Sequence, residues 1–235
     1  MRGTSKTNRT YEALRQEILN GRHPPGARLR IDLLSDSHGV SLGAVREALS
    51  RLTSEGLVVS EPQRGFIIAP LSKADLADLT SVRVEIETRC LARSIQIGDV
   101  AWEGRVLSAL HQMSRTPMQG SAPGINPAWT QLHAEFHDAL VAACDSAWWL
   151  RLRNHLFLQS ERYRYLPVPF VHADRDVDAE HRVIAQAAVA HDAEGATEAL
   201  ARHLRRTADI LLASDMPFDA AAPTRGTSLG ASRPL

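Results

Sequence analysis

The chain has 235 residues, 44% of them hydrophobic and 23% charged, and its 27 basic side chains balance its 27 acidic ones. These values are typical of a soluble globular protein with one large domain or two small ones, and the zero net charge gives no overall sign of a nucleic-acid partner. No run approaches the roughly 18 apolar residues of a membrane span, the N-terminus lacks the apolar core of a signal peptide, and the two cysteines fit a reducing compartment, so we expect a cytoplasmic protein without membrane contact.

The first seventy residues have the pattern of three helices and a β-hairpin. Apolar residues recur at helical spacing from Tyr11 to Ile18, and a Pro-Pro-Gly turn follows. A second short helix is expected around residues 33–37, and Ser41 is a good N-cap for a third. Two β-prone runs flank residues 62–65, which is a hairpin signal. This order of elements predicts a winged helix.

Basic residues are concentrated at the start of the chain. Residues 1–31 hold only two acids, Glu12 and Glu17. The cations of the same stretch are Arg2, Lys6, Arg9, Arg15, Arg22, Arg28 and Arg30. A local basic face of this kind can engage phosphates, although a solvated basic arm has the same composition. Charge alone does not choose between these two interpretations.

From about residue 75 the hairpin signals disappear and helical periods take over. The six expected helices cover residues 75–96, 102–114, 128–144, 147–166, 176–192 and 194–213, with one of the breaks at Gly195. The fold class is therefore mainly α, with a winged helix-turn-helix over residues 9–72 and an all-α antiparallel bundle over 75–214. Residues 1–8 are expected to form a flexible arm and residues 216–235 a disordered tail.

Four histidines of the helical part have a suggestive spacing. His133 and His137 are four residues apart on one expected helix, which puts both on the same face. His181 and His203 lie on two later helices. A single buried histidine is usually a hydrogen-bonded core residue, whereas a group of four can bind a divalent metal.

Two sets of motifs resemble one family of bacterial transcription regulators. The stretches "YEALRQEILNGRHPPGARLR", "GVSLGAVREALSRLTSEGLV" and "RGFIIAPLS" resemble the DNA-binding domain of the GntR family. The stretches "VRVEIETRCLA", "FHDAL", "EHRVIAQAA" and "ARHL" resemble the C-terminal FCD domain of its FadR subgroup. The resemblance covers about residues 9–214. It implies a homodimer that binds a palindromic operator and a small carboxylate effector, often with help from a metal ion. Within the subgroup, residues 143–164 are most similar to regulators of carbon-starvation and dicarboxylate catabolism genes.

The resemblance also implies which residues read DNA. Many relatives begin the third helix with Ser-Arg and place a second Arg four positions later. Ser41 and Arg46 match this pattern, but Leu42 replaces the first arginine. A bidentate arginine on guanine discriminates between bases by about 1–3 kcal/mol, so Arg46 is the main candidate for base readout. The expected DNA-binding set is Ser41, Gly43, Ala44, Arg46 and, at the tip of the wing, Arg64 and Gly65. With one usual arginine missing, we expect an operator that differs from the commonest half-site of the family.

The same comparison implies a metal and an effector site in the helical domain. His137, His181 and His203 match the three histidines of the family's metal site, and His133 stands where an aspartate or asparagine is usual. An all-nitrogen set favours borderline ions, with zinc or nickel expected here. Arg83 matches a common FCD arginine, and Arg162 is a second candidate for binding the carboxylate of the effector.

The function expected from these observations is a DNA-binding regulator whose operator affinity changes when an acid binds the metal-containing domain. One alternative is a regulator that senses the metal itself. Another is a metallohydrolase, because histidine-bound zinc with an open position activates water. Against the hydrolase, the sequence has no HExxH motif, and Glu135 would point away from the metal. We therefore do not expect an enzyme.

Overall fold

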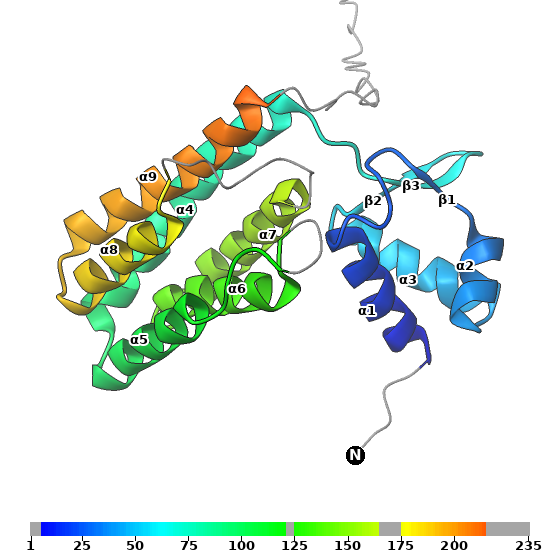
Figure 1. Ribbon diagram of the computed structural model, residues 1–235. Helices are drawn as coiled ribbons and strands as arrows, with labels where there is room; N and C mark the ends of the chain where they lie inside the picture. The colour runs from blue at the N-terminus through cyan, green and yellow to red at the C-terminus, as the bar shows by residue number, and fades with distance from the viewer. Residues whose placement is uncertain (1–5, 121–124, 165–174, 215–235) are drawn as a thin grey trace, which may run out of the picture.

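The computed structural model describes residues 6–120, 125–164 and 175–214. It has a smaller part with three helices and a sheet, and a larger part built from helices alone (Figure 1). This confirms the expected fold class. The expected disordered tail, residues 216–235, lies outside the described residues.

The smaller part is a winged helix. Its elements are α1 (Lys6–Leu19), β1 (Arg28–Leu29), α2 (Ile31–His38), α3 (Leu42–Ser54), β2 (Val58–Glu61) and β3 (Gly65–Ile68). The strands form an antiparallel sheet in the order β1-β3-β2, with Val58 opposite Ile68. The apolar faces of α1 and α3 bury Leu14, Val45 and Leu52 in one core. The two-residue strand β1 was not expected, because it is too short to show an alternating pattern.

Helix α1 begins at Lys6, which corrects one sequence-based boundary. Residues 6–8 were expected to belong to a flexible arm, but they form the first turn of this helix. Asn8 is held there because its side chain accepts a hydrogen bond from Arg51 on α3. The remaining residues of the expected arm lie outside the described part of the chain.

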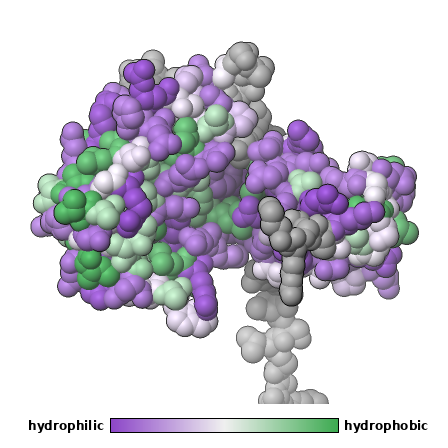
Figure 2. Space-filling model, turned by 90° about the horizontal axis from the view of Figure 1, so that it is seen from below, coloured by the Kyte–Doolittle hydropathy of each residue, from purple (hydrophilic) through white to green (hydrophobic). Residues whose placement is uncertain are grey.

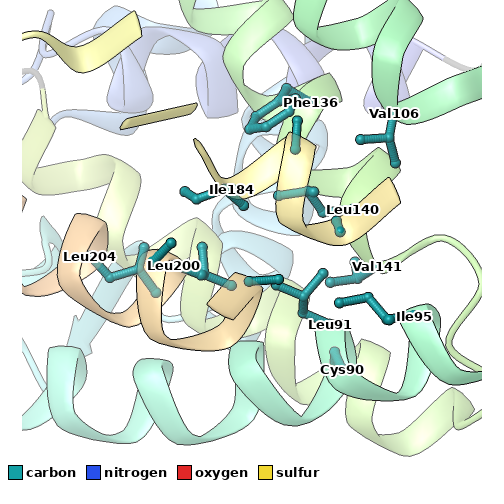
Figure 3. Packing of buried hydrophobic residues seen from close by; sticks show 14 of the residues in the cluster. Cys90, Leu91, Ile95, Val106, Phe136, Leu140, Val141, Ile184, Leu200 and Leu204 are labelled. Carbon is teal, nitrogen blue, oxygen red and sulfur yellow. The ribbon is translucent and has the colours of Figure 1, made fainter. Parts of the chain in front are cut away.

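The larger part contains six helices, as the sequence predicted. They are α4 (Lys73–Ile97), α5 (Val100–Ser114), α6 (Pro127–Val141), α7 (Ala147–Arg164), α8 (Val177–Val189) and α9 (Ala193–Ala213). Asp192 caps α9 by accepting a hydrogen bond from the amide of Gly195, so Gly195 lies inside the first turn and the break expected there falls three residues earlier. Figure 3 shows the core, where α4, α5, α6, α8 and α9 all contribute apolar side chains.

Helix α7 lies on the side of the bundle that faces the winged helix (Figure 1). Its Leu158 packs against the core of the smaller part. On the face drawn in Figure 2, the helical part carries more hydrophobic surface than the winged helix. Among the helices of the described residues, none is both long enough and apolar enough to cross a membrane.

Candidate DNA-reading surface and metal centre

Helix α3 presents the surface that the sequence assigned to DNA. The Ser41 Oγ accepts a hydrogen bond of 3.3 Å from the amide of Ala44, so this serine is the expected N-cap. Gly43 and Arg46 are exposed, whereas Val45 on the opposite face is fully buried. Across the described ranges, Arg46 has no hydrogen bond or ion pair. Its guanidinium is therefore free to contact a base, and the salt bridge that would compete with this role is not formed.

The wing brings a second cation to the same end of the molecule. Gln63 and Gly65 adopt positive φ angles of 63° and 88°, which form the tight turn between β2 and β3. The Arg64 side chain is 78% exposed, and its only ion pair in the described structure is a long one of 3.8 Å to Glu61. An exposed arginine at the tip of a hairpin can enter a minor groove.

The basic stretch at the start of the chain is partly neutralised. Arg15, Arg22 and Arg30 form ion pairs, with Glu55, Glu17 and Asp32 respectively. Lys6 and Arg9 line a hollow of about 250 Å³ beside the turn between α2 and α3. Arg2 lies outside the described residues. The cations beside the DNA-reading helix are thus fewer than the sequence count indicated.

The four expected histidines meet in the core of the helical domain. His133, His137, His181 and His203 each offer a ring nitrogen, and these atoms all lie within 4.8 Å of one another. All four side chains are buried, with exposed fractions from 0 to 5%. His133 and His137 come from α6, His181 from α8 and His203 from α9. The helical spacing and the antiparallel packing therefore produce one compact group of nitrogen donors.

Burial keeps these rings neutral. It holds the pKa of His133, His137 and His181 well below the usual 6.5, and nearby arginines and histidines lower it further. Neither ring nitrogen of His181 has a hydrogen-bond partner, and the same is true of His137 Nδ1. Buried polar atoms without partners are rare in native proteins. A divalent metal that prefers imidazole would satisfy the inward-facing nitrogens, so the donor set fits such an ion.

Glu180 supports the cluster from outside. Its carboxylate accepts a hydrogen bond of 2.8 Å from His203 Nδ1, which leaves Nε2 of this ring for the cluster. It also forms ion pairs with Arg175 at 2.7 Å and Arg206 at 3.1 Å. Although burial alone would raise it, these partners hold the pKa of Glu180 at about 2. A carboxylate behind a ligating histidine fixes the ring and its tautomer, as in many metal sites.

A second buried group of charges lies next to His137. Arg83 Nε donates to Glu87 at 2.6 Å, and Arg153 pairs with the other oxygen of this carboxylate at 3.4 Å. Both cations lower the pKa of His137, after burial and two other histidines of the cluster. One nitrogen of Arg83 and one of Arg153 are buried without a hydrogen-bond partner. Two unsatisfied guanidinium N–H groups beside a metal-competent cluster can bind a carboxylate.

Sequence comparisons give the chain its place among known proteins. Residues 6–68 match the model of the bacterial regulatory proteins of the gntR family, and residues 78–206 match the FCD domain. The chain is 38% identical over 204 residues to the HTH-type transcriptional regulator BphR of Paraburkholderia xenovorans, covering 86% of this chain and 83% of that protein.

This chain belongs to the GntR family. The FCD domain places it in the FadR subgroup.

Further relatives of this GntR regulator agree. It is 31% identical over 198 residues to the transcriptional repressor GlaR of Escherichia coli, covering 83% of this chain and 90% of that protein. Its fold matches the solved structure of E. coli McbR/YncC with a TM-score of 0.74 and 20% identity, over 88% of this chain and 97% of the other. The relatives are regulators, so the expectation that this protein is not an enzyme is confirmed. Glu135, the base that a hydrolase would need, is exposed and bonded to Gln131.

One expected effector residue of the regulator lies elsewhere. The Arg162 guanidinium donates hydrogen bonds to the backbone carbonyls of Ala69 and Pro70, between β3 and α4. This contradicts the expectation that Arg162 faces the ligand site, and its role is to join α7 to the winged helix. Arg153 and Arg164 of the same helix face the buried groups instead. The sequence did not separate them, because α7 contacts several neighbours and lacks one clear apolar face.

Proposed function

We propose that this GntR regulator is a cytoplasmic repressor that binds a palindromic operator as a homodimer and responds to a small carboxylate. The observation that carries the proposal is the adjacency of two buried groups. The four histidines, His133, His137, His181 and His203, can hold a divalent ion such as zinc or nickel. Beside them, Arg83 and Arg153 each have a buried N–H group without a partner.

The chemistry of the two groups is complementary to an organic acid. A metal with an open position binds one carboxylate oxygen, and a guanidinium binds the other oxygen or a second carboxylate. For DNA binding, the proposed contacts are those of Ser41, Gly43 and Ala44 to the backbone and those of Arg46 to a base edge. Arg64 and Gly65 would approach the neighbouring minor groove. These assignments rest on exposure and on the family pattern.

The proposed homodimer has a suitable surface on the helical domain. Trp148 and Leu152 are four residues apart on α7 and are 71% and 48% exposed, and Val82 on the neighbouring α4 is 45% exposed. Large apolar side chains gathered on one face are typical of interaction surfaces. Two copies related by a twofold axis would present two α3 helices to a palindromic site.

The experiment that tests the proposal is a thermal-shift screen of zinc-loaded protein against mono-, di- and tricarboxylates. Acids that raise the melting temperature are then added to an operator titration. We expect at least one acid to change the operator affinity and to lose its effect in the Arg83→Gln variant. If no acid stabilises the protein, or if the stabilising acid leaves operator affinity unchanged, the effector role is wrong.

A regulator that senses the metal itself is a second candidate, favoured by one observation. The cavity that reaches His133 and His203 measures only about 20 Å³, which is room for about one water molecule and not for an acid. If zinc alone changes operator affinity fully and acids add nothing, this second function is the correct one.

A further inference from the structure

Arg164, at the end of α7, contacts the histidine cluster. Its guanidinium nitrogen lies 2.8 Å from His133 Nδ1, and the same side chain forms an ion pair of 2.9 Å with Glu161. A guanidinium can only donate hydrogen bonds, so Nδ1 must be the accepting nitrogen of the neutral ring. The proton of His133 is then on Nε2, from which it is donated to His137 Nε2 at 3.1 Å.

This hydrogen-bond arrangement prevents His133 from binding a metal. A ring nitrogen that carries a proton has no lone pair for an ion. If Nε2 gives up its proton to ligate, the proton moves to Nδ1, and two donors then face each other at the Arg164 contact. The aspartate or asparagine that is usual in the family avoids this conflict, because its oxygens can accept from an arginine and bind a cation together. The conflict is therefore a consequence of His133 in this chain.

The same turn of α7 holds the DNA-binding domain. Two residues before Arg164, Arg162 donates to the carbonyl of Pro70 at 3.1 Å. One turn earlier, the Gln159 amide donates to the carbonyl of Glu55 at 2.5 Å, at the C-terminal end of α3. Figure 1 shows this end of α7 beside the winged helix. A change in the position of Arg164 therefore acts on a turn that is bonded to the DNA-reading helix.

We propose that Arg164 and the metal compete for His133, and that this competition couples the metal site to the winged helix. Without metal, Arg164 donates to His133 and the last turn of α7 keeps the contacts described above. With metal, His133 ligates through Nε2, its proton moves to Nδ1, and Arg164 is displaced. Arg164 is a positioning residue in this scheme. The proposal rests on the metal site proposed above, and its tests separate the two.

The first test measures zinc affinity without DNA, by competition with a chromophoric chelator at pH 7.5. Arg164→Gln removes the conflict, because an amide can donate or accept, and we expect it to bind zinc about tenfold more tightly than the wild type. The matched control is Arg164→Lys, which still only donates and is expected to keep the affinity near that of the wild type. In a His133→Ala background, Arg164→Gln should change nothing.

The possible outcomes distinguish the proposals. If neither wild type nor variants bind zinc, the metal site itself is wrong and the competition fails with it. If zinc binds but Arg164→Gln leaves the affinity equal or weaker while the variant melts cooperatively, only the competition is overturned. A tenfold gain that persists in the His133→Ala background also overturns it, because the effect would not pass through this ring.

The second test measures the coupling. Zinc is expected to change the operator affinity of the wild type, measured by fluorescence anisotropy. The double variant Gln159→Ala with Arg162→Gln should keep its zinc affinity but show an operator affinity that no longer depends on zinc. A zinc dependence equal to that of the wild type would show that the signal does not travel through this turn.

Discussion

The buried histidines predict an unusual loss of stability in mild acid. The metal-free protein should lose stability between pH 7.5 and pH 5.5, a range above the titration of ordinary carboxyl groups. The pKa of His133, His137 and His181 in the folded protein lies well below 6.5, chiefly because the rings are buried. In the unfolded chain these rings have their usual pKa, so the unfolded state takes up protons first as the pH falls.

The magnitude follows from proton linkage. Above pH 7.5 both states are neutral and the rings contribute no pH dependence. Between pH 7.5 and 5.5, each ring that stays neutral only when folded costs about 1.4 kcal/mol. The three rings together therefore lower the free energy of unfolding by about 4 kcal/mol, a large share of the 5–15 kcal/mol that is typical of a domain. A bound metal should remove most of this loss, because it holds the rings deprotonated.

The assay is urea unfolding followed by tryptophan fluorescence, in a chelating buffer of constant ionic strength. His181→Gln and His137→Asn each remove one of the three rings. Each should reduce the loss between the two pH values by about a third, whatever its stability at pH 7.5. Stability that stays constant within about 1 kcal/mol over this range would refute the reasoning. So would variants that keep the full loss.

Three further predictions concern the DNA-reading helix and the metal. Arg46→Ala should weaken operator binding by about 1–3 kcal/mol in a gel shift, whereas the exposed Arg89→Ala on α4 should not, and equal effects would argue against base readout. Leu42→Arg should enrich guanine at one operator position in a selection from random sites, and an unchanged site would show that Leu42 does not face a base. Zinc at about a thousand times its dissociation constant should stabilise the protein by about 4 kcal/mol, and His203→Ala should abolish most of this gain. Equal stabilisation of that variant would exclude the histidine cluster as the site.

Much of the fold was predictable because its signals are local. The N-cap at Ser41, the apolar face of α3 and the positive-φ turn at Gly65 all depend on residues close in sequence. The convergence of the histidines was predictable for a different reason. His133 and His137 share one helix face, and the family pattern supplied the other two rings.

The errors came from contacts between distant segments. Arg162 was assigned to the effector, but its position on α7 turns it toward the carbonyls of Ala69 and Pro70. Arg153 and Arg164 were passed over, although they lie on the same helix within hydrogen-bonding distance of Glu87 and His133. Helix α7 is packed on several sides, so periodicity could not indicate which arginine faces which neighbour.

The most direct test of the regulatory role is the operator affinity of the zinc-loaded protein with and without a stabilising carboxylate. Fluorescence anisotropy with labelled operator DNA gives both dissociation constants, and His137→Ala provides a protein with an impaired cluster. The proposed function predicts that the acid changes the wild-type constant by about 5- to 150-fold, the range of ordinary allosteric coupling, and leaves the variant unchanged. An acid that binds the wild type tightly while the operator constant stays the same would contradict it.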